Sequence, residues 1–238
     1  MIDVGDRGNV RLCTINRPER RNAFDQEHYH ALAGALAEAA QSPDIHVVVI
    51  TGTATSFSAG QDLKEMAALA AGASTGNNDG FPALLHELET FPKPLLAAVN
   101  GDAVGIGMTM LLHCDIAIVA GEARLRVPFS ELGVPPEAGS SALLADRVGW
   151  QQAAELLYTS RWISGTEAVA MNLALRALPA ERVLDETQSL AVAIAERSPW
   201  AVQTAKRLLL EARGDRSRAA RRREDAAFAE LFGRVSGG

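Results

Sequence analysis

Residues 97–116 read AAVNGDAVGIGMTMLLHCDI, a stretch that combines a predicted strand, a glycine-rich turn and a predicted short helix. It begins within the apolar run Leu95–Val99, which predicts a short buried strand. Gly105 and Gly107 then give the backbone freedom to turn, and Met108–His113 predicts a short helix. Where a turn meets a helix start, backbone N–H groups lack partners within the helix and can bind a negatively charged oxygen. Taken alone, the glycines are better explained by a simple packing turn.

The same arrangement occurs earlier in the chain, in FSAGQDLKEM, residues 57–66. This segment follows an apolar strand predicted over His46–Thr51, and Gly60 permits a sharp turn before the next helix. One such turn is weak evidence, but two in matching contexts reinforce each other. Together they predict a pair of backbone N–H donors, near Ala59 and Ile106, that stabilise negative charge on one oxygen.

Working outward, strands alternate with helices until about Ala138, and the pattern is helical from there on. This alternation predicts an α/β fold with a largely parallel sheet, in which ligands bind at the carboxyl ends of the strands. Asp25 and Ser164 are predicted helix caps, and Gly72–Gly80 is the most loop-like stretch. The other predicted strands are Val10–Ile15, Asp115–Ala120 and Ala123–Val127, and the other predicted helices are Asp25–Gln41, Phe81–Thr90, Val183–Glu196, Pro199–Ala212 and Arg216–Phe232.

The composition is that of an ordinary globular protein: 238 residues, 47% hydrophobic and 22% charged. The net charge of −6 argues against nucleic-acid binding, and the basic run Arg221–Arg223 is interpreted as a solvated helix face. Cys13 and Cys114 lie in apolar segments without metal-ligand spacing, which predicts buried free thiols in a reducing compartment. No secretory signal and no apolar run of about 18 residues is present, so we expect a cytoplasmic protein without membrane contact.

Several segments together resemble the crotonase superfamily, the enoyl-CoA hydratase/isomerase group. They are NRPERRNAF (16–24), FSAGQDLKEM (57–66), NGDAVGIG (100–107) and SGTEAVAMNL (164–173). The resemblance covers most of the chain. It implies an α/β crotonase (ClpP-like) spiral of ββα units over residues 1–195. Residues 196–238 would form a helical region that builds a homotrimer or a hexamer.

The resemblance also implies an acyl-CoA thioester substrate, with coenzyme A as part of the substrate and with no separate cofactor or metal. In this family the N–H groups at the positions matching Ala59 and Ile106 form an oxyanion hole for the thioester carbonyl. Such donors lower the barrier to removing a neighbouring proton, and losing one typically costs about 100- to 1,000-fold in rate. The residues assigned to coenzyme A binding on this ground are Arg21, Ala23, Ala59, Gln61, Asp62, Leu63 and Ile106.

The reaction depends on the acid–base residues. A hydratase of this family uses two glutamates, and the matching positions here are Thr109 and Phe129, neither of which is a base near neutral pH. The segment PFSELGVPPEAGSS, residues 128–141, resembles peroxisomal-type Δ3,Δ2-enoyl-CoA isomerases, whose catalytic glutamate matches Glu137. A double-bond shift needs one base, and a positioned base contributes roughly 100- to 10,000-fold to the rate.

Other interpretations of the acidic residues stay open at this stage. From the residues alone, Glu137 is also explained as an acid before a helix, where the helix dipole favours it. Glu131 is the nearest rival carboxylate and is predicted to lie at the surface. Asp62 is predicted to cap a helix, Asp115 to make a structural hydrogen bond, and His113 to be a core or edge residue. Catalysis by Glu137 therefore rests on the resemblance.

Three functions follow from these residues. The first is a Δ3,Δ2-enoyl-CoA isomerase of fatty-acid metabolism with Glu137 as base. The second is another crotonase reaction, such as enoyl-CoA hydration, and the third is a non-catalytic acyl-CoA-binding protein. The wall of the acyl pocket is predicted within Ala67–Gly80 and near Phe81, and the sequence does not specify the acyl chain length.

Overall fold

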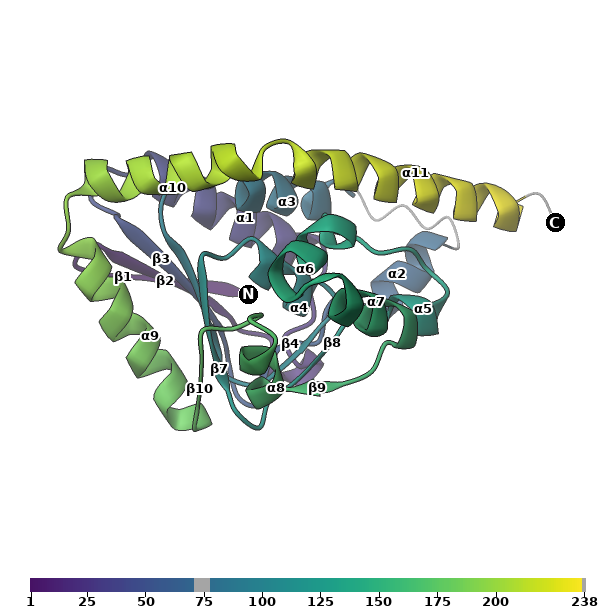
Figure 1. Ribbon diagram of the computed structural model, residues 1–238, viewed down its shortest axis with the longest axis horizontal. Helices are drawn as coiled ribbons and strands as arrows, with labels where there is room; N and C mark the ends of the chain where they lie inside the picture. The colour runs from purple at the N-terminus through teal and green to yellow at the C-terminus, as the bar shows by residue number, and fades with distance from the viewer. Residues whose placement is uncertain (71–77, 237–238) are drawn as a thin grey trace.

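A six-stranded sheet organises the fold in the computed structural model, which describes residues 1–70 and 78–236 (Figure 1). The first pair of strands is antiparallel and every later pair is parallel, which confirms the predicted sheet type. In spatial order the strands are β1 (Ile2–Arg7), β2 (Val10–Ile15), β3 (Val47–Gly52), β5 (Leu95–Val99), β7 (Ile116–Ala120) and β10 (Arg176–Leu178). Strand β1 was not predicted from the sequence, because Ile2 is its one buried residue and its side chains show no apolar alternation.

A second, four-stranded sheet is built from very short strands. In spatial order they are β4 (Ser56–Ser58), β6 (Asp102–Val104), β8 (Arg124–Arg126) and β9 (Ile163–Ser164). The β4–β6 and β6–β8 pairs are parallel, and β8–β9 is antiparallel. Strands of two or three residues have no readable alternation. The sequence therefore did not predict β4 or β6, whereas β8 was predicted because apolar and charged residues alternate over Ala123–Val127 around it.

The helices fall largely where the sequence predicted them. Asp25 caps the first long helix by accepting the His28 N–H at 3.0 Å, and Ser164 and Glu167 form the predicted capping box. Their bounds are α1 (Gln26–Gln41), α2 (Leu63–Ala70), α3 (Gly80–Thr90), α4 (Ile106–Thr109), α5 (Phe129–Leu132), α6 (Ser140–Val148), α7 (Trp150–Thr159), α8 (Gly165–Ala170), α9 (Ala180–Ala195), α10 (Pro199–Arg213) and α11 (Arg216–Ser236), with 3-10 turns at Pro18–Arg20 and Met110–Leu112. Most of the predicted loop Gly72–Gly80 lies outside the described residues.

Three consecutive units give the chain its spiral. Each unit has one strand in the large sheet, one in the small sheet and then a helix: β3-β4-α2, β5-β6-α4 and β7-β8-α5. This arrangement confirms the predicted spiral of ββα units. Strands β3 and β5 are buried along almost their whole length, and Cys13 and Cys114 are buried free thiols. The junctions between the two sheets bring successive turns together on one side of the molecule.

The C-terminal helices lie across one face of this spiral. Helix α9 packs on the large sheet, and α10 and α11 follow one another above α3 and α6 (Figure 1). The predicted division of the chain at residue 195 stays a prediction. Among the described residues, no helix combines the length and the apolar character that crossing a lipid bilayer requires.

Candidate active site

The two glycine turns singled out in the sequence lie against each other. Strands β4 and β6 pair side by side just before the turns, and Gly60 and Gly105 adopt positive φ angles of 90° and 54°. A Cβ atom on Gly60 would lie 2.8 Å from the Val104 carbonyl oxygen, and one on Gly107 would lie 2.6 Å from the Ser58 carbonyl oxygen. Any side chain at these positions would push the turns apart. The predicted pairing of the two turns is therefore present in the structure.

Helix α4 begins at Ile106, and in the described part of the chain the N–H of Ile106 has no hydrogen-bond acceptor. The structure contradicts the prediction for Ala59, because the Ala59 N–H already donates to the Arg21 carbonyl at 2.9 Å. An N–H that is already bonded is not available to a thioester oxygen. The neighbouring Gly60 and Asp62 N–H groups are also bonded, to the Ser58 hydroxyl and the Phe24 carbonyl.

In this turn, Gln61 carries the free N–H group. Its N–H has no acceptor among residues 1–70 and 78–236, although its backbone forms a bridge with Phe24. In this bridge Phe24 bonds the Gly60 carbonyl and the Asp62 N–H, which lie on either side of Gln61. The N–H of Gln61 itself is not used, because a parallel bridge bonds through the neighbouring residues. The sequence placed the donor two positions too early. Which of four successive N–H groups is free depends on the strand that pairs with them.

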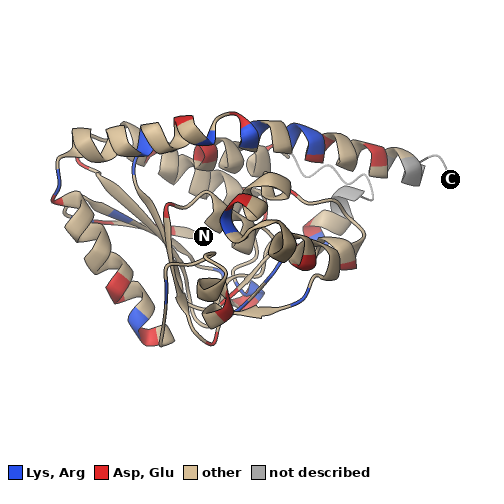
Figure 2. Cartoon of the chain, in the orientation of Figure 1, with Lys and Arg blue, Asp and Glu red and all other residues tan. Residues whose placement is uncertain are grey.

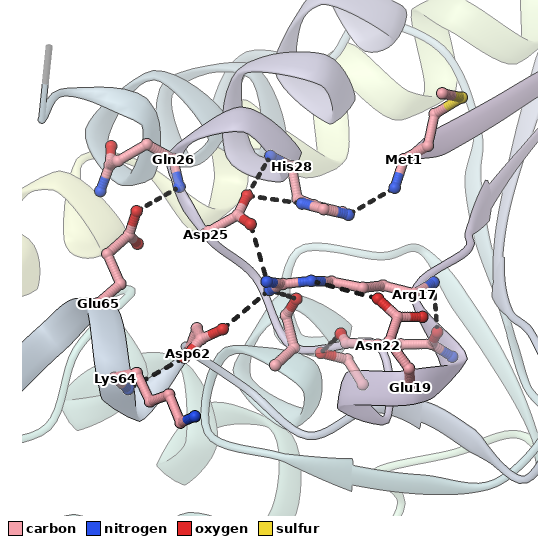
Figure 3. Close-up of polar contacts among 12 residues, drawn as sticks. Met1, Arg17, Glu19, Asn22, Asp25, Gln26, His28, Asp62, Lys64 and Glu65 are labelled. Atoms are coloured by element: carbon pink, nitrogen blue, oxygen red, sulfur yellow. Dashed lines mark hydrogen bonds and ion pairs between the residues drawn. The ribbon is translucent and has the colours of Figure 1, made fainter. Parts of the chain in front are cut away.

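The segments predicted to contact coenzyme A, residues 21–23 and 59–63, run side by side through these backbone bonds. Arg17, a mostly buried arginine that was not predicted as a site residue, links the two segments (Figure 3). The Arg17 guanidinium lies 3.2 Å from Asp25 and 3.0 Å from Asp62, and it donates to the Ala23 carbonyl at 3.1 Å. Its position in a basic loop next to the predicted cap Asp25 was the available signal. Arg17 therefore holds segments 21–23 and 59–63 together.

The seven residues assigned to coenzyme A differ in exposure. Arg21 and Leu63 are open to solvent, whereas Ala23 and Ile106 are buried and Ala59, Gln61 and Asp62 are intermediate. The Asp62 carboxylate pairs with Arg17 and also accepts the Lys64 N–H at 3.0 Å. This supports its interpretation as a helix-start residue.

Glu137 lies beside the helix that carries Ile106. Its Oε1 accepts a hydrogen bond from the Thr109 hydroxyl at 2.7 Å. The residue as a whole is only partly buried, but its Oε2 is shielded from solvent and has no partner in the described part of the chain. Burial raises the pKa of the Glu137 carboxyl to about 8, against the opposing effect of the Thr109 hydrogen bond, and the charge of Glu224 adds to the increase. A carboxyl with this pKa can both take and return a proton near neutral pH.

The rival acidic residues are engaged elsewhere. Glu131 is exposed and pairs with Arg126 through both oxygens, at 2.8 and 3.1 Å. Asp115 accepts the Leu95 N–H at 2.8 Å and the Lys206 ammonium at 2.7 Å, as expected of a structural residue. Glu137, by contrast, contacts α4 through Thr109, and its Oε2 has no partner in the described part of the chain.

His113 supports the same segment through the backbone. Its Nε2 lies 2.8 Å from the Ala138 carbonyl oxygen, and the ring is buried. Burial, and then the charge of Arg213, lowers the pKa of His113 to about 4, so the ring is neutral near pH 7. Its role is to hold the backbone next to Glu137. Within the described ranges, no three His, Cys, Asp or Glu residues gather as a metal site.

A profile of the family described as Enoyl-CoA hydratase/isomerase matches residues 5–236. The chain belongs to this family. It is 37% identical over 206 residues to the 2,3-dehydroadipyl-CoA hydratase of Escherichia coli (strain K12), which covers 87% of this chain and 80% of that relative. It is 32% identical over 211 residues to the enoyl-CoA delta isomerase 2 of Rattus norvegicus, which covers 87% of this chain and 54% of that relative.

The solved structures agree with this family. The crystal structure of the enoyl-CoA hydratase/isomerase from Pseudoalteromonas atlantica T6c superposes with a TM-score of 0.91 at 34% identity, covering 96% of this chain and 90% of that one. The chain is thus an enzyme of the enoyl-CoA hydratase/isomerase family with the crotonase fold. Relatives with names of both kinds match it, so the reaction has to be argued from the site.

Proposed function

We propose that this enoyl-CoA hydratase/isomerase family member is a Δ3,Δ2-enoyl-CoA isomerase that uses Glu137 as its single base. The observation that carries the proposal is the contact between Thr109 and Glu137 at 2.7 Å. Thr109 stands where a hydratase of the resembled type has its first glutamate, and Phe129, at the second position, is a buried apolar side chain. The site therefore contains one carboxylate with a raised pKa, as a proton shuttle requires.

In the proposed mechanism the thioester carbonyl oxygen binds the N–H groups of Gln61 and Ile106. Glu137 removes a proton from C2 of the 3-enoyl-CoA, and the electron pair moves onto the carbonyl oxygen as a dienolate. The two backbone donors stabilise this charge. The protonated Glu137 then returns the proton to C4, the oxygen lone pair re-forms the carbonyl, and the double bond ends between C2 and C3. Composition and charge are unchanged overall.

The coenzyme A moiety would lie along the paired segments 21–23 and 59–63. The proposal extends to assembly as a homotrimer or a hexamer in the cytoplasm. Three apolar side chains on α10 support an assembly surface, because Trp200, Leu208 and Leu209 are 77%, 53% and 70% exposed.

Hydration is the second candidate, because the Escherichia coli relative is named a hydratase. With Thr109 and Phe129 in place of two glutamates, water would have to be activated by Glu137 alone. A single base that must bind water and also return the proton is expected to be slower than a pair. Isomerisation is therefore the better match to the described side chains.

The test compares 3-hexenoyl-CoA isomerisation with crotonyl-CoA hydration for the wild type and for Glu137→Gln. We expect isomerisation to dominate, and Glu137→Gln to lose roughly 100- to 10,000-fold in kcat while acyl-CoA binding persists. Glu131→Gln is the matched control, since it changes an exposed carboxylate six residues away. Full activity of Glu137→Gln, or hydration faster than isomerisation, would overturn the proposal. Tight acyl-CoA binding without any turnover would identify a non-catalytic binder.

A further inference from the structure

Helix α11 places a buried carboxylate against the backbone that carries Glu137. Glu224 is 4% exposed. Its Oε2 accepts the Gly139 N–H at 2.7 Å, and its Oε1 accepts the Ser141 N–H at 2.8 Å. Both oxygens of one side chain therefore hold the peptide groups that closely follow Glu137.

These two bonds perform a capping function that the local sequence cannot. Helix α6 begins at Ser140, and its cap residue, Gly139, has a φ of 73° and no side chain that could bond the free N–H groups. A Cβ at Gly139 would lie 3.0 Å from the Ser217 hydroxyl oxygen, so the packing of α11 leaves little room for another cap residue. Unpaired N–H groups at a helix start favour a negatively charged acceptor. Glu224 provides that acceptor from a distant part of the chain.

Helix α11 is itself anchored by polar contacts near its first turns. The Ser217 hydroxyl donates to Glu89 at 2.6 Å, and the Arg221 guanidinium donates to the same carboxylate at 2.8 Å. Arg216 pairs with Asp146 of α6 at 2.8 Å. Figure 2 shows basic and acidic residues following one another along this helix. The carboxylate of Glu224 is thus presented by a fixed helix.

The charged and titratable groups that face Glu137 come from several elements. Glu224 lies on α11, and its negative charge raises the pKa of Glu137 in addition to burial. Tyr29 lies on α1, and its own pKa is raised by burial and then by Glu137 and Glu65. His113 holds the adjacent Ala138 carbonyl and is neutral near pH 7. No described cation pairs with Glu137.

We propose that Glu224 is a positioning residue of the active site, which fixes the backbone of Glu137 through the Gly139 and Ser141 N–H groups. The inference rests on the proposed function only in taking Glu137 as the base. It makes the C-terminal helix a working part of the site, whereas the sequence assigned residues 196–238 to oligomerisation. Glu224 acts on the substrate only through Glu137.

The test uses Glu224→Gln beside Asp225→Asn, a matched control that removes the same charge from the next, exposed residue of the helix. Both kcat and KM are followed against pH with 3-hexenoyl-CoA as the substrate. The ionisation of Glu137 is titrated separately, by infrared difference spectra against Glu137→Gln. For Glu224→Gln we expect the high-pH plateau of kcat to fall about 10- to 100-fold while KM changes little, as when a reacting group is displaced.

The expected pH shift has a definite sign. Removing the Glu224 charge lowers the pKa of Glu137, so the rise of kcat with pH moves to lower pH, and Asp225→Asn leaves it in place. Glu224→Asp keeps the charge but is too short to reach both N–H groups. It should lower kcat with little change in the pKa of Glu137, and it serves as the second variant if Glu224→Gln does not fold.

Two results for Glu224→Gln would overturn the inference. One is a Glu224→Gln enzyme with the kcat and the Glu137 pKa of the Asp225→Asn control. The other is a Glu224→Gln enzyme that loses kcat and thermal stability with an unchanged Glu137 pKa, which would indicate general destabilisation. For Glu224→Asp, which keeps the charge, the overturning result is a wild-type kcat. The infrared titration needs no turnover. A wild type without isomerase activity would therefore refute the proposed function and leave this inference to be decided by the pKa alone.

Discussion

Different contacts hold the glycine turns and the segment 134–141, which carries the proposed base Glu137. The turns at Gly60 and Gly105 touch each other, and each belongs to one ββα unit of the spiral. The segment around Glu137 is held by Thr109, 28 residues earlier, and by Glu224, whose bonded amide at Gly139 is 85 residues away. The proposed donors thus depend on the repeated fold, whereas the segment around the proposed base depends on the single side chains of Thr109, His113 and Glu224. Substitutions around Glu137 can therefore change the reaction without altering the glycine turns.

Among the residues that support the site, the largest effect is expected from changing the glycine turns. Gly107→Ala would put a Cβ 2.6 Å from the Ser58 carbonyl oxygen and displace the N–H of Ile106. Because one donor of the oxyanion hole is then misplaced, kcat should fall about 100- to 1,000-fold. Steady-state isomerisation assays measure this. Gly34→Ala is the control, since a Cβ there meets nothing within 4 Å. A Gly107→Ala enzyme with wild-type kcat would show that the turns are not the donors.

A smaller effect is expected from removing the hydrogen bond between Thr109 and Glu137. Thr109→Val keeps the shape of the side chain but removes the hydrogen bond to Glu137. Because this bond lowers the pKa of Glu137, its loss raises the pKa, and the rise of kcat moves to higher pH. Near neutral pH the rate should fall roughly tenfold, the size of one hydrogen bond to a charged group. A pH–rate profile decides the sign, which is opposite to that expected for Glu224→Gln. A shift to lower pH would contradict the assignment.

The smallest effect is expected from changing Tyr29, a buried side chain near Glu137. The Tyr29 hydroxyl is buried without a partner in the described part of the chain, while its ring packs on Phe24 and Phe81. Tyr29→Phe keeps these ring contacts, so stability should stay within about 1 kcal/mol or improve. Chemical denaturation and kcat measure the outcome. A fall in kcat of more than about tenfold, well beyond one neutral hydrogen bond, would make this hydroxyl a third support of the base.

The same contrast explains what could be predicted from the sequence. Strands β2 and β5 and the cap at Asp25 were predicted at the observed residues, because short-range patterns determine them. The paired turns were predicted for the same reason. The donor was placed at Ala59 instead of Gln61, because strand pairing decides which N–H group stays free.

Glu224 was missed because it adjoins a basic run that the sequence analysis interpreted as a solvated face. A signal was nevertheless present. Ser217, Ala220 and Glu224 share one face of α11 at helical spacing, and all three are buried. An acid on the buried stripe of a helix needs a polar partner. That partner could not be identified from the sequence, because it is the backbone of another helix.

Because Glu224 follows Gly139 by 85 residues, the contacts around Glu137 also form in a fixed order during synthesis. A ribosome releases the two glycine turns and Glu137 well before α11, and domains form from the N-terminal side as the chain emerges. A nascent chain that ends before residue 224 contains both glycine turns but lacks the side chain that bonds Gly139 and Ser141. The backbone next to Glu137 therefore gains these two hydrogen bonds only after residue 224 has emerged.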